Sequence, residues 1–233
     1  MSVKKLAIFV EGKTELIFIK KLLIEIAGRN NIEIQCKVLQ GQGRCPEIEQ
    51  FNDSTSKYKI LLYNSCTDNR VLSDMKDNYD NLISKNYSKI LGLRDLYPNP
   101  FEKKDRIIRL IQQNLDNESL DKITMIIAVM EVETWFIGEL NHYSKIDTEL
   151  TVDYIKNSLI DLESIGNFEE DISHPADTLH QIYQLKGMAW KKTESQIKRT
   201  VNSLDYENLY CETRDKISSL NRLIVELDNF FSK

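Results

Sequence analysis

The stretch KLAIFVEGKTELIFI, residues 5–19, decides the fold of this chain. Residues 5–10 form a short apolar run without a polar face, which is typical of a strand buried on both sides. From residue 16 to residue 27 apolar side chains recur at helical spacing, which predicts a helix. In open α/β sheets the turn between such a strand and helix borders the crevice where ligands bind.

Two acids and one glycine lie in this turn. Glu11 directly follows the predicted strand, and Glu15 lies in the first helical turn. A carboxylate here is close to the positive end of the helix dipole, so it stays ionised and can hold a hard cation. The alternative is that Thr14 caps the helix, Gly12 makes the turn and the acids only suit a first helical turn. That alternative accounts for Thr14 and Glu15 better than for Glu11.

Predicted strands and helices alternate over the first 140 residues. We expect strands at residues 5–10, 32–39, 58–63, 89–93 and 123–130, and helices at residues 16–27, 70–84 and 103–115. Because this alternation favours parallel pairing, the sequence predicts an α/β fold whose parallel sheet is covered on both faces. Residues 123–130 are the most apolar run, and we expect them to form the central strand.

Helical periodicity takes over from about residue 145. The segments with this periodicity lie near residues 151–162, 175–186, 193–203 and 213–231. We therefore expect a catalytic α/β domain over residues 1–145 and a helical extension over residues 146–233. The extension would pack against the sheet or contact a partner.

The composition excludes several classes of protein. The 233 residues carry 36 acids against 31 basic residues and a net charge of −5, which argues against a protein that coats DNA non-specifically. The four cysteines form no CxxC pair, which argues against a zinc ribbon or a disulfide framework. No stretch approaches the roughly 20 apolar residues that span a bilayer, and no signal peptide is evident. We expect a cytoplasmic protein without membrane contact.

Acidic residues follow several of the predicted strands. Glu11 follows the first strand, Asp95 the fourth, and Glu131 and Glu133 the last. Because parallel strands point their carboxyl ends at one edge of the sheet, we expect these side chains to converge. Clustered carboxylates repel one another unless a divalent cation neutralises them. Oxygen ligands with open positions suit Mg²⁺ or Mn²⁺, which can activate water and stabilise a leaving phosphate oxygen.

The motif VEGKTE at residues 10–15, followed by acids at later strand ends, resembles the Toprim superfamily. This superfamily provides the catalytic domain of topoisomerases, bacterial primases and OLD-family nucleases. Other segments are similar to small stand-alone Toprim proteins of bacterial defence and mobile-element loci: GLRDLYP at 92–98, EVETWF at 131–136, HPAD at 174–177 and WKKT at 190–193. The resemblance covers most of the chain. It implies a Toprim (Rossmann-like) parallel sheet with a C-terminal helical extension.

The resemblance also implies roles for the acids. Glu11 is the metal-binding or general-base glutamate, and Asp95 is the aspartate of the second motif. Glu131 or Glu133 completes the cluster, and Glu15 is a further metal ligand or only a helix-dipole acid. The metal implied is Mg²⁺ or Mn²⁺.

The second motif departs from the Toprim pattern. Toprim domains usually carry Asp-x-Asp there, whereas the segment LRDLY at residues 93–97 supplies Asp95 alone. Either Glu131, Glu133 or Asp68 replaces the missing ligand, or the site uses one metal, or the protein is catalytically silent.

For the segment WKKT at residues 190–193, the resemblance implies that Lys191 or Lys192 is the cation that stabilises charge in the transition state, as in OLD-like nucleases. Trp190 lies in a basic stretch, where its ring can stack on a base. We expect Trp135 and Phe136, by contrast, to be core residues.

We therefore expect a magnesium-dependent endonuclease that cleaves phosphodiester bonds in DNA or in a structured RNA such as tRNA. The resemblance further implies an anti-phage defence effector that works beside an ABC- or OLD-type ATPase. Whether it forms a homo-oligomer is open. The alternative is a catalytically silent Toprim-fold module that docks on an ATPase partner through its helical tail.

Overall fold

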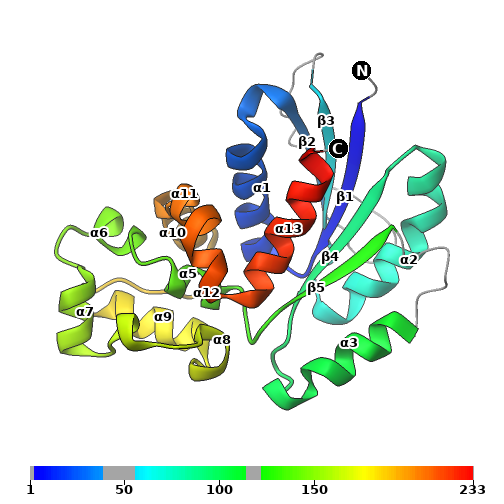
Figure 1. Ribbon diagram of the computed structural model, residues 1–233. Coiled ribbons are helices and arrows are strands. Elements are labelled where there is room, and N and C mark those ends of the chain that lie inside the picture. The colour runs from blue at the N-terminus through cyan, green and yellow to red at the C-terminus, as the bar shows by residue number, and fades with distance from the viewer. Residues whose placement is uncertain (1–2, 39–55, 114–121, 233) are drawn as a thin grey trace. The chain divides into compact units, whose positions relative to one another are not determined.

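The computed structural model describes residues 3–38, 56–113 and 122–232 (Figure 1). The chain divides into two compact units. The first comprises residues 1–95, 102–127 and 226–233, and the second comprises residues 96–101 and 128–225. The predicted boundary after residue 145 therefore falls inside the second unit, because the chain leaves the sheet at the end of its last strand and not after the following helix.

The first unit is built on a five-stranded parallel sheet in the order β2-β3-β1-β4-β5. Its strands are β1 (Lys4–Val10), β2 (Ile32–Val38), β3 (Tyr58–Asn64), β4 (Lys89–Asp95) and β5 (Ile123–Ala128). Two hydrogen bonds connect β4 with β5: Ile90 N donates to Lys122 O and Leu96 N donates to Ala128 O, both at 2.8 Å. Since the residue numbers rise in the same direction on both sides, the two strands run parallel. The predicted α/β class with a parallel sheet is confirmed.

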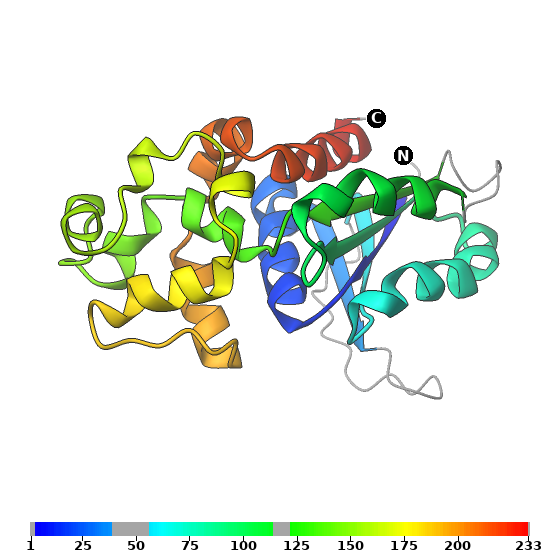
Figure 2. The same cartoon turned by 90° about the horizontal axis from the view of Figure 1, so that it is seen from below.

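Helices cover both faces of this sheet. α1 (Lys13–Ala27) packs against β2 and β3, whereas α2 (Asp68–Ser84) packs against β1 and β4 (Figure 2). Since right-handed crossovers in opposite directions put their helices on opposite faces, this arrangement follows from the strand order. The unit also holds α3 (Lys104–Gln113), the 3₁₀ turn η1 (Arg29–Asn31), the last two residues of the 3₁₀ turn η2 (Phe101–Lys103), and the last turns of α13 (Ser218–Ser232).

The central strand is β1, so the prediction that residues 123–130 form the centre is wrong. Residues 6–10 of β1 are completely buried between its two neighbouring strands and the helices. β5 lies at an edge of the sheet, yet its own apolar side chains are buried, among them Ile126 and Ala128. The alternating strand β2 is the opposite edge and is half-covered, as its pattern predicts.

The second unit is helical. Its helices are α5 (Glu133–Gly138), α6 (His142–Ile146), α7 (Val152–Ser158), α8 (Phe168–Asp171), α9 (Pro175–Gln184), α10 (Glu194–Ser203), α11 (Tyr206–Asn208), α12 (Arg214–Lys216) and most of α13, with a 3₁₀ turn η3 (Leu162–Ser164) and a π turn η4 (Leu209–Thr213). In the described part of the chain, no helix has both the length and the apolarity needed to cross a bilayer.

The helix predicted over residues 213–231 is broken at Ile217. This residue has an extended backbone between α12 and α13, and its side chain is completely buried. It packs over Gly138 of α5, where an added Cβ would lie 2.6 Å from Ile217 Cδ1. Next to this contact, Trp135 Nε1 donates to Ser219 Oγ at 2.8 Å, which fixes α5 on the start of α13.

Glu139 is a fully buried acid in the core of the second unit. Its Oε1 accepts hydrogen bonds from Asn141 N and Asn208 Nδ2, both at 2.9 Å, and its Oε2 accepts one from Asp205 N at 3.0 Å. Burial alone would raise its pKa, but these hydrogen bonds and the adjacent His142 outweigh burial, so the net pKa of Glu139 lies below its ordinary value.

We expect Glu139→Gln to destabilise the protein in a pH-dependent way. Near neutral pH the amide of Gln faces N–H donors, which costs about 1–3 kcal/mol of unfolding free energy. Because the folded-state pKa of Glu139 lies below the unfolded value of about 4.5, its stabilising contribution is present above that value and is lost as the pH falls through the folded pKa. Urea unfolding at several pH values should show the gap between wild type and variant closing on acidification. Glu149→Gln, at a highly exposed acid, is the control. A gap that does not change with pH would contradict this account.

The packing of β4 gives a second prediction. A Cβ on Gly92 would lie 2.5 Å from Met75 Sδ of α2 and 2.7 Å from Met125 Sδ of β5, whereas a Cβ on Gly166 meets nothing within 4 Å. Gly92→Ala should therefore cost about 1–3 kcal/mol of unfolding free energy through overpacking. Gly166→Ala should stay within about 0.5 kcal/mol of wild type. Denaturant midpoints measure both, and equal midpoints would refute the close packing at Gly92.

Candidate metal centre

Two predicted acids meet at the carboxyl ends of β1 and β4. These strands are neighbours, and the chain leaves β1 toward β2 at one edge of the sheet and leaves β4 toward β5 at the other. This reversal is the topological switch point where open α/β sheets bind ligands. Glu11 follows β1, Asp95 ends β4, and Glu11 Oε2 accepts a hydrogen bond from Asp95 N at 3.0 Å. Glu11 thus holds the backbone at the end of β4.

The turn after β5 presents the other two acids. Met130 adopts a left-handed conformation with φ of 59°, and its carbonyl oxygen accepts a hydrogen bond from Tyr97 N at 2.9 Å. Glu131 comes next, and α5 begins at Glu133 after the fully buried Val132. This sharp turn, in a conformation that is uncommon for a non-glycine residue, places both carboxylates on the same side of the chain.

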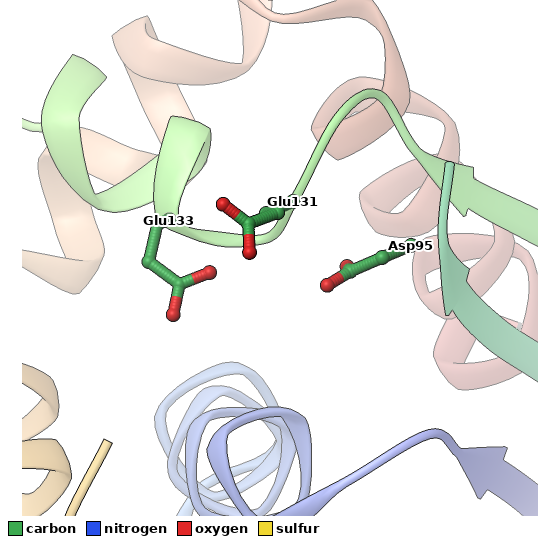
Figure 3. A group of neighbouring side chains, drawn as sticks. All are labelled: Asp95, Glu131 and Glu133. Atoms are coloured by element: carbon green, nitrogen blue, oxygen red, sulfur yellow. The ribbon is translucent and has the colours of Figure 1, made fainter. Parts of the chain in front are cut away.

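Asp95, Glu131 and Glu133 form a compact group of carboxylates (Figure 3). One oxygen of each lies within 4.8 Å of the others; Asp95 and Glu133 are buried and Glu131 is partly buried. The residue after Asp95, Leu96, donates its backbone N–H to Ala128 O at the end of β5. The group can bind a metal ion, since three converging carboxylate oxygens are ligands that hard divalent cations prefer.

Lys192 is the cation of this group. Its Nζ lies 3.1 Å from Glu131 Oε1 and 3.0 Å from Glu133 Oε1. The residue has φ of 53°, which turns the chain just before α10. Its neighbour Lys191 is exposed, and its backbone N–H donates to Gln196 Oε1 at 2.6 Å. Of the two predicted lysines, the structure therefore brings Lys192 to the acids.

Trp190 holds Glu133 and does not stack on a base. Its side chain is only 4% exposed, its Nε1 donates to Glu133 Oε1 at 3.2 Å, and its ring meets Phe136 and Tyr183 edge-on. Its backbone N–H donates to His180 Nδ1 at 2.9 Å. Of the two roles that the sequence left open for Trp190, its buried ring favours the core position over base stacking, and the predicted core positions of Trp135 and Phe136 are confirmed.

Glu133 is electrostatically the unusual member. Its side chain is fully buried, and its Oε2 has no hydrogen-bond partner among the described residues. Burial raises the pKa of Glu133; Lys192 opposes this effect and Glu131 adds to it, so the net pKa lies above the ordinary value. Because a buried polar atom without a partner is costly, this oxygen points to a ligand or proton that completes the site.

Glu131 is held from two sides. Its Oε2 accepts a hydrogen bond from Ala176 N at 3.0 Å, at the first turn of α9, and its Oε1 meets Lys192. The carboxylate therefore satisfies an orphan N–H at a helix start, where a negative charge is favourable. The sequence offered no local signal for this contact or for the bond between Trp190 and Glu133, since the partners are 45 and 57 residues apart.

Two other predicted ligands, Glu11 and Glu15, are not members of the carboxylate group. Glu11 instead accepts the hydrogen bond from Asp95 N, and Glu15 is buried in the first turn of α1. The side chain of Asp68 lies outside the described residues. The expected capping by Thr14 is wrong: α1 begins at Lys13, the capping residue is Gly12 with extended backbone, and Thr14 is already helical. Because glycine has no side chain, no side-chain hydrogen bond from the capping residue closes this end of α1.

The sequence profile of one protein family matches residues 10–210, a range that contains every residue of the carboxylate group and Lys192. No curated protein and no solved structure matches the chain significantly. The chain belongs to the matching family, which is described as a domain of unknown function (DUF4276).

Proposed function

We propose that this protein is a metal-dependent nuclease of Toprim type, with Mg²⁺ or Mn²⁺ bound by Asp95, Glu131 and Glu133. The observation that carries the proposal is the group of three carboxylates, one oxygen of each within 4.8 Å of the others; one further oxygen, Glu133 Oε2, is buried without a hydrogen-bond partner in the described part of the chain. When they are ionised, three clustered carboxylates repel one another, and a divalent cation would offset this repulsion.

The residues around the group support hydrolysis of a phosphodiester. A bound divalent ion would activate water and neutralise charge on phosphate oxygens. Glu11 keeps the end of β4, and with it Asp95, in place through the hydrogen bond to Asp95 N. Lys192 provides the positive charge that would stabilise the transition state.

Several further parts of the proposal come from the resemblance of VEGKTE at residues 10–15 to the Toprim motif. They are the nucleic-acid substrate, DNA or tRNA, the role in anti-phage defence and the ABC- or OLD-type ATPase partner. With a net charge of −5, binding of nucleic acid would depend on the metal and on local cations.

A second candidate function is a catalytically silent module that docks on an ATPase partner through its helical tail. Two observations favour it. Residues 93–97 supply one aspartate where Toprim domains carry two. Both oxygens of Glu131 and one oxygen of Glu133 are also engaged by protein donors, as in a structural ion pair.

Metal binding separates the two candidates. A competent site stabilises the folded state by RT ln(1 + [L]/Kd), about 2.7 kcal/mol at 100 times Kd, so Mg²⁺ or Mn²⁺ should raise the melting temperature. Asp95→Asn should lose this shift, whereas Glu194→Gln, at an exposed acid of α10, should retain it. A silent module predicts no metal-dependent shift in any of these proteins.

Cleavage tests the reaction itself. We expect wild type with Mg²⁺ or Mn²⁺ to cleave plasmid DNA or total tRNA, and Asp95→Asn to lose about 100-fold or more of that rate, the scale on which a lost charge-stabilising group acts. The matched control is again Glu194→Gln. Gel assays and initial rates measure both, and full activity in Asp95→Asn would disprove the proposed site. If metal shifts the melting temperature and neither substrate is cleaved, the assay is repeated with the copurified ATPase partner.

A further inference from the structure

Glu131 and Glu133 each have a second anchor besides Lys192. Glu133 is held by Trp190 Nε1 within the core, and Glu131 by Ala176 N at the start of α9. The side chain of Lys192 is 38% exposed and has a long flexible stem. The two carboxylates therefore keep an anchor of their own if the ammonium group moves.

Lys192 occupies the positions that a metal needs. Its Nζ bridges Glu131 Oε1 and Glu133 Oε1 at 3.1 Å and 3.0 Å. A divalent ion bound to the same two carboxylates would stand within a few ångströms of the ammonium group, and two cations at that distance repel each other strongly in a partly buried site. The ion and the ammonium group therefore compete for the same negative charge.

The remaining oxygen shows that the ammonium group does not complete the site. Glu133 Oε2 stays buried without a partner among the described residues while Lys192 sits on Oε1. A metal ion can bind both oxygens of one carboxylate, which a single bridging ammonium group does not do here. An ion would thus satisfy an atom that Lys192 leaves unsatisfied.

We propose that Lys192 is the resident cation of this site and that a divalent metal ion displaces its ammonium group from Glu131 and Glu133. The inference rests on the proposed metal site and adds its regulation: Lys192 keeps the acids neutralised without metal and sets how tightly metal binds. Once displaced, the ammonium group stays near the metal, where it can meet an anionic ligand that arrives with it. Because the ammonium group would become available to the anionic ligand only after the metal has bound, binding of the metal and binding of the anionic ligand would favour each other.

Calorimetric titration of the full chain with Mn²⁺ tests the competition. Lys192→Met removes the charge and keeps most of the stem, so Mn²⁺ should bind about 10-fold more tightly than to wild type, within the usual range of coupling between two ligands. Lys191→Met is the matched control, because it removes the same charge from the exposed residue next to Lys192. This variant should bind Mn²⁺ with the affinity of wild type.

The outcomes separate this inference from the proposed function. Unchanged or weaker Mn²⁺ binding by Lys192→Met, with clear binding by wild type, would overturn the exchange and leave the metal site standing. Binding that is absent in wild type and present in Lys192→Met would support the exchange strongly. No binding by any of the three proteins would overturn the metal site and, with it, the exchange.

A readout on the wild-type chain covers the case in which Lys192→Met does not fold. Acetylation with an N-hydroxysuccinimide ester reports whether a lysine amine is free, and mass spectrometry of non-tryptic peptides resolves Lys191 from Lys192. Mg²⁺ should raise acetylation of Lys192 several-fold and leave that of Lys191 unchanged. Acetylation of Lys192 that stays the same or falls with Mg²⁺ bound would show that the ammonium group is not released.

Discussion

The burial of the Glu133 carboxylate is the constraint around which the second unit is arranged. A fully buried carboxylate is tolerated only with compensating charge and hydrogen bonds. These come from Trp190 and Lys192, on a segment that lies nearly sixty residues further along the chain. His180 of α9 holds that segment in turn through Trp190 N, and Glu131 holds the start of α9. One buried acid thus connects α5, α9 and the turn before α10.

A comparison of two buried acids in the same unit shows why this one points to function. Both oxygens of Glu139 accept hydrogen bonds, and its pKa lies below the ordinary value, so it is a satisfied structural anion. Glu133 keeps an oxygen without a partner among the described residues, and its pKa lies above the ordinary value. The protein therefore carries the energetic cost of one buried carboxylate whose hydrogen bonding is incomplete, and that carboxylate lies beside Asp95 and Glu131.

The sequence predicts those parts of the molecule that local patterns determine. The buried strand at residues 5–10, the alternation of strands and helices, and the placement of Asp95 and Glu131 at strand ends follow from periodicity and from the geometry of parallel sheets. The central position of β1 does not, because apolarity reports burial and not the order of strands: β5 is equally apolar at an edge. Strand order depends on crossovers that no local pattern encodes.

The candidate site divides in the same way. Residue types and strand ends indicate which acids can converge, but the anchors of these acids are contacts between distant segments, as between Trp190 and Glu133. A tryptophan in a basic stretch has the same local sequence whether it stacks on a base or donates to a buried acid. The choice between Lys191 and Lys192 is likewise set by the left-handed backbone of Lys192, which two adjacent lysines do not reveal.

The most direct measurement of the central claim is an anomalous difference map at the manganese absorption edge, from crystals grown or soaked with Mn²⁺. The account predicts a peak about 2.0–2.2 Å from oxygens of Asp95, Glu131 and Glu133. A peak elsewhere, or none at these carboxylates at saturating Mn²⁺, would contradict it.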